Sequence, residues 1–318
     1  MTIQSRLSER SAILMEGALG ERLKREYGLA FDPHLALAVL VNTEEGRIAL
    51  AELWAQYIAI AGKYGLPFLA TTPTRRANRE RVAEAGLDEA VILDNARFLL
   101  GIKASSGIEM YAGGLMGCRG DAYTGEGALS EREAHAFHAW QANCFKRAGV
   151  DFLCAAIMPT LPEAQGMAAA MSDTELPYII SFTIQKSGKL IDGTSIHDAI
   201  VSIDASVARR PLCYMTNCVY PAIAHEALSQ PCNRTDTVKN RFKGIQGNAS
   251  PLPYAELDGS SVLQCAEPAI FAKDAMRLKT DMGLQILGGC CGTDNRHLDA
   301  LARLLTSPEC ADKGRSQA

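Results

Sequence analysis

The chain has 318 residues, of which 47% are hydrophobic, and it carries 32 Lys and Arg against 36 Asp and Glu, a formal net charge of −4. A chain of this length and apolar content can bury about three quarters of its unfolded surface, which excludes a disordered protein or a disulfide-stapled miniprotein. The slight acidic excess argues against the basic surface that nucleic-acid binding requires.

Nothing in the sequence indicates a membrane partner. The longest apolar runs, such as 36–41 and 96–102, fall far short of the roughly 20 residues that a membrane span needs. The charged start of the chain has no apolar segment of the kind a secretory signal carries, so we expect a cytoplasmic protein. In that compartment the 10 cysteines are expected to be reduced, and most of them to fill the core as small hydrophobic residues.

Short apolar runs of β-type residues recur along the chain, and stretches with helical periodicity separate them. Apolar residues at three- and four-residue spacing predict a helix over 48–61, between the first two runs, and another over 131–148, between the third and the fourth. Strands that alternate with helices are typical of βα units around a parallel sheet. The runs, about eight in number, are 12–15, 66–70, 108–112, 152–157, 178–184, 212–216, 243–246 and 284–287.

Eight βα units favour an α/β fold of the closed kind, a single (β/α)8 TIM barrel, over an open doubly wound sheet. An open sheet that binds dinucleotides carries a glycine-rich fingerprint after its first strand, and here Gly17 and Gly20 lack the third glycine. The sequence therefore predicts one barrel over 1–306 and a polar C-terminal tail over 307–318. In such barrels the functional groups lie where strands end and the βα loops begin.

Three cysteines lie at predicted strand ends. Cys290 and Cys291 follow the eighth run in the segment GGCCGT, and Cys218 follows the sixth. Neighbouring residues of a strand point to opposite faces, so Cys290 and Cys291 can address one point only if the flanking glycines let the backbone leave strand geometry. A vicinal disulfide is the competing use of this pair in an oxidising context.

The ends of strands six and eight are near neighbours in a closed barrel, so these three thiols could converge on one ion. Three thiolates with a fourth position left free suit Zn²⁺, which prefers tetrahedral sulfur and nitrogen sites and is catalytic when one position is open. The spacing is not that of a zinc ribbon, and buried small side chains are the simpler interpretation of the residues alone.

The combination of GGCCGT at 288–293 with Asn217 and Cys218 resembles the homocysteine S-methyltransferase family, zinc-dependent barrels that use donors such as betaine or S-methylmethionine. The resemblance spans nearly the whole chain. Weaker segments fall in the family's order at 15–23, 71–78, 112–114, 121–125 and 192–194.

The resemblance implies that Cys218, Cys290 and Cys291 bind Zn²⁺ and that the thiol of homocysteine becomes the fourth ligand. A free thiol, with a pKa of about 8.5, is mostly protonated at neutral pH, and binding to Zn²⁺ deprotonates it. The partner is a small methyl-onium donor, whose positive charge disappears as it gives up CH₃, so a dry anionic site favours transfer without a general acid.

Several residues are candidate substrate contacts around this metal. The family usually has Asp-Gly at the first strand, where the acid holds the amino group of homocysteine, and this chain has Glu16 and Gly17, which keep the charge on a longer arm. In the third loop, Asp121 or Tyr123 is expected to border the pocket. The remaining candidates are Thr71 and Thr72, which end the second strand, and Asn217, which either orients the Cys218 thiolate or caps the local turn.

One departure concerns the end of the fourth strand, where the family often has an acid facing the amino-acid substrate and this chain has Ala156. Glu163 could replace that acid, but Thr160 and Glu163 also form a capping-box pattern, which is the preferred interpretation. His135 and His138 share a helical face without a third ligand, so we expect them on the outside of the barrel, solvated or partly packed.

The sequence thus predicts a zinc-dependent S-methyltransferase that makes methionine from homocysteine. The donor is expected to be of the S-methylmethionine, betaine or dimethylsulfoniopropionate type. Two alternatives stay open: a related zinc barrel that methylates a different thiol, because Ala156 replaces the expected acid, and a zinc-binding or redox-sensing protein without turnover. The sequence specifies no oligomeric state, and a homo-oligomer remains open.

Overall fold

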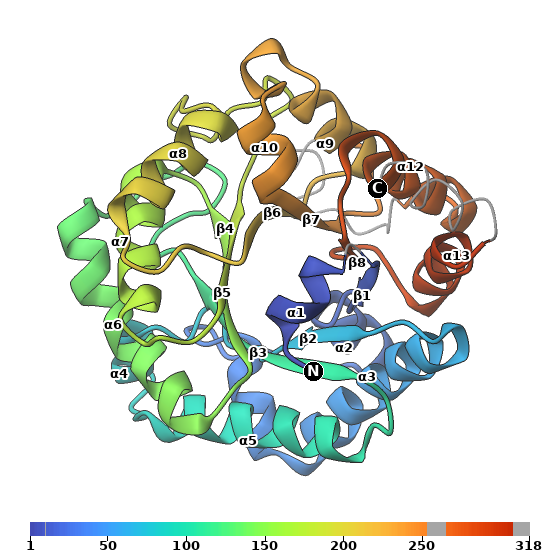
Figure 1. Ribbon diagram of the computed structural model, residues 1–318. Coiled ribbons are helices and arrows are strands. Elements are labelled where there is room, and N and C mark those ends of the chain that lie inside the picture. The colour runs from blue at the N-terminus through green and yellow to red at the C-terminus, as the bar shows by residue number, and fades with distance from the viewer. Residues whose placement is uncertain (10, 253–264, 308–318) are drawn as a thin grey trace.

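In the computed structural model, which describes residues 1–9, 11–252 and 265–307, parallel strands form a closed barrel in chain order (Figure 1). The ring closes where β1 pairs with β8, with Ile13 beside Ile286. Each predicted run overlaps one strand, so the predicted (β/α)8 barrel is confirmed. The strands are β1 (Ile13–Met15), β2 (Phe68–Thr71), β3 (Met110–Gly117), β4 (Phe152–Met158), β5 (Tyr178–Phe182), β6 (Cys213–Asn217), β7 (Phe242–Gly247) and β8 (Ile286–Gly289).

Helices form an outer ring around these strands (Figure 1). The predicted helix 48–61 lies within α3, and the predicted helix 131–148 coincides with α6. No described helix has both the length and the apolar character that crossing a membrane requires. The helices are α1 (Ile3–Ser8), α2 (Gly20–Tyr27), α3 (Glu44–Tyr64), α4 (Arg79–Glu84), α5 (Ala90–Ser105), α6 (Glu131–Ala148), α7 (Leu161–Ser172), α8 (Ile196–Ser206), α9 (Pro221–Leu228), α10 (Asp236–Arg241), α12 (Pro268–Met282) and α13 (Asn295–Leu305), with 3₁₀ turns η1 (Leu37–Asn42) and η2 (Pro231–Asn233).

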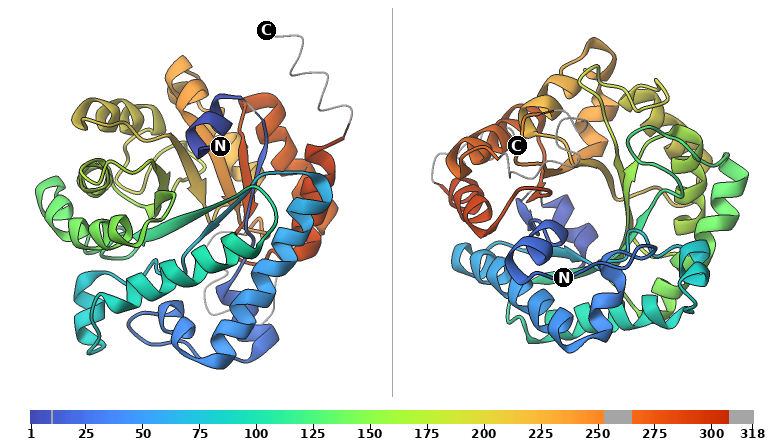
Figure 2. Two further views of the ribbon diagram at one scale, coloured as in Figure 1. Left: turned by 60° about the horizontal axis from the view of Figure 1, so that its bottom comes forward. Right: turned by 180° about the vertical axis from the view of Figure 1, so that it is seen from behind.

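Buried side chains form two layers on either side of the sheet. Ile13 and Met15 point into the barrel interior, whereas Leu14 between them packs outward against the helices, because successive strand residues face opposite sides. At the N-terminal ends of the strands, α1 closes the barrel (Figure 2): Ile3 joins the inner cluster, and Gln285 donates to the main-chain oxygen of Leu7 at 2.8 Å. The carboxyl ends of the strands are therefore left for the site.

Strand β3 extends beyond the predicted run 108–112 and continues through two glycines to Gly117. A Cβ at Gly113 would overlap the ring of Phe152, and a Cβ at Gly114 would overlap the ring of Phe145. Glycine at these positions lets the two aromatic rings fill the space on either side of the strand. The two glycines therefore serve side-chain packing within the strand and do not mark a loop.

The predicted capping box at the start of α7 is wrong. The hydroxyl of Thr160 makes no hydrogen bond to any described residue, and the fully buried Glu163 makes its contacts away from the helix end. Its carboxylate instead accepts from the main-chain N–H of Arg119 at 2.7 Å and contacts Nε2 of His138 at 3.1 Å. The expectation for His138 is therefore also wrong, because this ring is buried between α6 and α7, whereas His135 is partly exposed and pairs with an aspartate on the surface.

Of the predicted polar tail over 307–318, residues 308–318 lie outside the described part of the chain.

Candidate active site

The structure brings together the three cysteines singled out in the sequence. All three Sγ atoms lie within 4.8 Å of one another. Barrel register explains this: Asn217 pairs with Gln246 on β7, which in turn pairs with Gly288 on β8, so Cys218 and Cys290 follow the two strands that flank β7, at a similar level. The Sγ atoms of Cys218 and Cys290 are 2.50 Å apart and those of Cys290 and Cys291 3.9 Å apart, so the vicinal disulfide is not formed.

The local backbone conformation orients these thiols toward one another. Cys218 adopts the left-handed region, with φ of 59°, which turns its side chain out of strand geometry. After β8, Gly292 has φ of +79°, and the hydroxyl of Thr293 donates to the main-chain oxygen of Cys290 at 2.7 Å. A Cβ at Gly289 would overlap Thr293, so glycine is required for this tight turn.

Hydrogen bonds among the three thiols give them different pKa values. Donation from Cys290, and then from Cys291, lowers the pKa of Cys218 well below its ordinary value. The same contact raises the pKa of Cys290 well above it and the pKa of Cys291 to about 12. The hydroxyl of Tyr123 also hydrogen-bonds Cys218, and burial raises the pKa of that tyrosine. Three sulfur atoms this close cannot all ionise without a cation between them.

These thiols form part of the wall of a pocket of about 230 Å³ at the carboxyl ends of the strands. Most of the predicted substrate contacts line it as well: Glu16, Gly17, Thr71, Thr72 and Asn217. Tyr123, from the loop after β3, also lines the pocket.

Asp121 is not among the residues of the pocket wall. Its side chain is exposed and accepts from the main-chain N–H groups of Tyr123 at 2.7 Å and Thr124 at 2.8 Å, and these bonds lower its pKa. Asp121 thus shapes the loop that carries Tyr123 to the site.

Glu16 is buried at the end of β1 and its carboxylate is held from two elements. Oε1 accepts from the main-chain N–H of Thr71 at 2.8 Å and from its hydroxyl at 2.7 Å, and Oε2 accepts from Nε1 of Trp54 at 2.6 Å. Burial raises the pKa of Glu16 to about 7, although these three hydrogen bonds act in the opposite direction. A carboxylate offers about four acceptor positions, so one on Oε2 is left for a donor in the pocket.

Asn217 holds the end of β4 rather than serving as a simple turn cap. Its Oδ1 accepts from the main-chain N–H of Ile157 at 3.2 Å and from the hydroxyl of Ser181 at 2.5 Å. Ile157 has φ of 54°, a strained conformation for a β-branched residue, and lies next to Ala156 in the pocket wall. The position where the family often has an acid is therefore apolar here, with a fixed backbone.

The sequence interpretation did not include two positively charged residues of the pocket. Arg75 and Arg76 follow β2 and line the same pocket as the cysteines. The available signal is the pair of adjacent cations directly after the threonine-rich strand end, a position that faces the mouth of a barrel.

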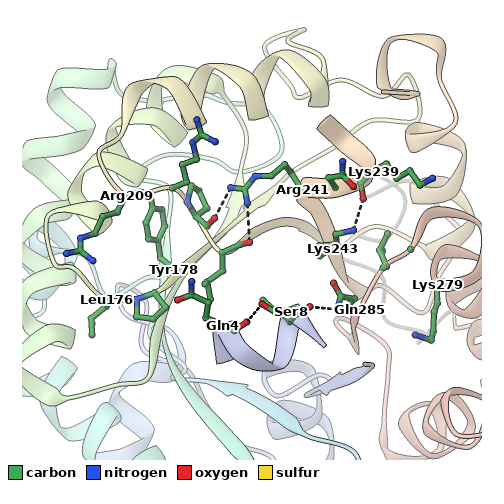
Figure 3. Close-up of a pocket in the computed structure, with 18 of the residues that line it drawn as sticks. Gln4, Ser8, Leu176, Tyr178, Arg209, Lys239, Arg241, Lys243, Lys279 and Gln285 are labelled. Atoms are coloured by element: carbon green, nitrogen blue, oxygen red, sulfur yellow. Dashed lines mark hydrogen bonds between the residues drawn. The ribbon is translucent and has the colours of Figure 1, made fainter. Parts of the chain in front are cut away.

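A larger cavity of about 890 Å³ lies at the opposite end of the barrel, beside α1 (Figure 3). It has many cationic side chains, but Arg241 pairs with Asp204 at 2.8 Å, and Nζ of Lys243 donates to the main-chain oxygen of Lys239 at 2.6 Å. Arg209 and Lys279 lie on opposite sides of the cavity (Figure 3). These charges do not converge on one point, and the chemistry belongs to the smaller pocket.

Comparison with known families agrees with this geometry. The profile of the homocysteine S-methyltransferase family matches residues 13–305. The chain belongs to the homocysteine S-methyltransferase family. It is therefore a methyltransferase, and the predicted alternative of a zinc or redox sensor without turnover is not retained.

Two solved structures of the homocysteine methyltransferase MmuM from Escherichia coli share the fold. The metallated form matches with a TM-score of 0.72 at 20% identity over 94% of this chain and 98% of that one. The oxidized form matches with a TM-score of 0.71 at 20% identity over 94% and 97%. A comparison with curated protein sequences found no match.

Proposed function

We propose that this methyltransferase transfers a methyl group from a small onium donor to homocysteine, giving methionine, and that Zn²⁺ held by Cys218, Cys290 and Cys291 is required. The observation that carries the proposal is the convergence of these sulfur atoms on one point of the pocket wall. Tetrahedral Zn–S bonds of about 2.3 Å would separate the sulfur atoms by about 3.8 Å. The 3.9 Å between Cys290 and Cys291 is close to that value, whereas Cys218 and Cys290, 2.50 Å apart, would have to separate around the ion. The donor set therefore fits zinc with one position open to the pocket.

Zinc bound there would lower the pKa of the homocysteine thiol and hold it as a thiolate for attack on the donor methyl. The residues of this chain bind the substrate and orient the groups that contact it. Glu16, in its deprotonated form, presents the remaining acceptor position of Oε2 to the α-ammonium group of homocysteine. Thr71 and Trp54 fix that carboxylate, and the Tyr123 hydroxyl fixes the sulfur of Cys218.

The donor supplies its own driving force. A sulfonium or quaternary ammonium group loses its charge as the methyl leaves, so the reaction needs an anionic, partly dry pocket and no protonation of the leaving group. Cys218 and Cys290 are half-buried, and Ala156 and Ile157 add apolar surface to the pocket wall. We infer a donor of the S-methylmethionine, betaine or dimethylsulfoniopropionate type.

The second candidate is the same chemistry on a different thiol. Ala156 supports it, because an α-ammonium group would find no acid at the end of β4. Two acids, Glu16 and Glu21, line the pocket, and Glu21 already accepts from the main-chain N–H of Gly292. Glu16 could replace the missing acid, and homocysteine remains the preferred acceptor for that reason.

The test is methionine formation by zinc-loaded protein from homocysteine and each of the three donors, measured by mass spectrometry. Wild-type protein is expected to give methionine with at least one donor, and Cys290→Ala with none. Absence of methionine above the Cys290→Ala control for every donor would overturn the proposal. Competition of homocysteine against other thiols for the zinc-loaded protein separates the two acceptor assignments.

A further inference from the structure

Arg75 and Arg76 place two positive charges in the wall of the substrate pocket. Both side chains are half-buried and follow β2 directly after the threonines that hold Glu16 and β3. The stem of Arg75 crosses the end of β3 at Gly117, where a Cβ would lie 2.7 Å from its Cγ. Glycine at 117 therefore leaves the room that this arginine occupies.

The hydrogen-bond partners of Arg76 are incomplete. Its Nε is buried and has no hydrogen-bond partner among the described residues. Nearby arginines are satisfied: Nη2 of Arg81 donates to the main-chain oxygen of Arg119 at 3.2 Å, and Nε of Arg119 pairs with Glu80 at 2.9 Å. A buried guanidinium N–H without an acceptor is unfavourable, because it has lost water and gained nothing in return.

The positive charges around Arg76 also favour a bound anion. Burial, followed by the positive charges of Arg76 and Arg75, lowers the pKa of Arg81. Three guanidinium groups thus repel one another beside the pocket, and an anion between them and the thiols would relieve that repulsion. The planar fork of arginine matches a carboxylate with two parallel N–H donors.

We propose that Arg76, with Arg75 beside it, binds a substrate carboxylate in this pocket, so that the enzyme selects substrates that carry one. The inference rests on the proposed function for the identity of the two substrates. The carboxylate belongs either to the thiol acceptor or to the onium donor, since homocysteine, betaine and dimethylsulfoniopropionate each have one. With Glu16 in the same pocket, the site would recognise both the carboxylate and the ammonium group of an amino-acid substrate.

The experiment measures dissociation constants by calorimetry on zinc-loaded protein, with one substrate at a time. The acceptor arm compares homocysteine with 3-aminopropane-1-thiol, which lacks only the carboxylate. The donor arm compares dimethylsulfoniopropionate with trimethylsulfonium, and betaine with choline. Because binding is measured without turnover, the result does not depend on whether methionine forms, and failure of the proposed methyl transfer is distinguishable from failure of carboxylate binding.

The variants are Arg76→Gln, Arg76→Lys and Arg75→Gln, with Arg79→Gln as the matched control, because Arg79 is exposed on α4 and does not line the pocket. We expect Arg76→Gln to weaken binding of the carboxylate-bearing molecule of one arm by about tenfold or more and to leave its carboxylate-free partner unchanged. Arg76→Lys should recover part of the loss, since it restores charge without the fork.

The arm that responds identifies the source of the carboxylate. Zinc content and melting temperature equal to wild type show that the variant is folded; if Arg76→Gln fails to fold, Arg76→Lys and the wild-type preference within each pair decide. The proposal is overturned if wild-type protein binds both members of every pair equally. It is equally overturned if folded Arg76→Gln loses affinity for both members to the same extent, or if Arg79→Gln has the same effect.

Discussion

Glu16 occupies the position at the end of β1 where the family usually has aspartate, and its longer arm has a physical consequence. The extra methylene lets the carboxylate reach both Trp54 on α3 and Thr71 on β2. These contacts anchor the group and also draw it out of water, so burial raises its pKa to about 7. The residue is therefore a fixed acceptor whose charge depends on pH near neutrality.

This pKa makes folding stability depend on pH. Because the folded pKa of Glu16 is raised above its ordinary value of 4.5, its stabilising contribution is complete below that value and is lost as the pH rises through about 7. Between pH 5.5 and 8 we expect Glu16 to lower the free energy of unfolding by about 2 kcal/mol. Urea unfolding of wild type and Glu16→Gln across this range should show that the variant lacks this fall.

Activity is expected to follow the opposite trend. If deprotonated Glu16 binds the α-ammonium group, kcat/KM for homocysteine rises with pH through about 7 in wild type and lacks that rise in Glu16→Gln. The exposed Glu45→Gln serves as the control in both measurements. Identical pH slopes for wild type and Glu16→Gln would show that this carboxyl does not titrate near neutrality.

The three cysteines give a second prediction at this scale. Replacing any one of Cys218, Cys290 or Cys291 by serine should remove bound zinc and lower methionine formation by about a hundredfold or more, because the three sulfur atoms surround one point. Cys232→Ser, an exposed cysteine elsewhere, should retain both. Zinc is measured by atomic emission on gel-filtered protein, and a ligand variant with full zinc content would contradict the assignment.

At the scale of elements, Glu163 ties the loop after β3 to α6 and α7. Its side chain and that of His138 have no exposed surface, and the carboxylate accepts from the main-chain N–H of Arg119. Glu163→Gln keeps one carbonyl acceptor and turns the other oxygen into a donor, so we expect it to lower the free energy of unfolding by about 1–3 kcal/mol. Urea unfolding measures this, with the exposed Glu126→Gln in the same loop expected to stay within about 0.5 kcal/mol of wild type. A Glu163→Gln variant as stable as wild type would mean that the buried carboxylate is dispensable.

Glu163 also shows what a local sequence motif cannot predict. Thr160 and Glu163 have the spacing of a capping box, yet the structure uses the acid for tertiary contacts with the main-chain N–H of Arg119 and the buried ring of His138. Buried polar groups such as this carboxylate take such partners wherever the fold supplies them. A sequence motif indicates only the contacts that are possible within its own segment, not those with residues distant in the chain. Helix α6, by contrast, has the bounds that its apolar periodicity predicts, and local groups fix both ends: a capping box at Ser130 and a left-handed Gly149.

At the scale of the whole molecule, the barrel could be predicted because each of its units carries its own periodicity. Barrel closure then fixes which strand ends are neighbours, which is why Cys218 and Cys290 could be placed together although 72 residues separate them. The direction of loop side chains could not be predicted in this way. Tyr123, Arg75 and Arg76 reach the pocket and Asp121 does not, because turns have no repeating period that assigns a face.

Assembly of the zinc ligands by the fold leads to a final prediction. Of the three ligands, only Cys290 and Cys291 are neighbours in an unfolded chain, whereas the native barrel adds Cys218, so we expect zinc to bind the folded state more tightly. At free zinc about 100-fold above its dissociation constant, this difference stabilises the protein by up to about 2.7 kcal/mol and raises Tm by several degrees. Differential scanning calorimetry with and without zinc measures it. Cys218→Ser should lose most of the increase. An equal rise in Cys218→Ser would place the metal at the adjacent pair alone.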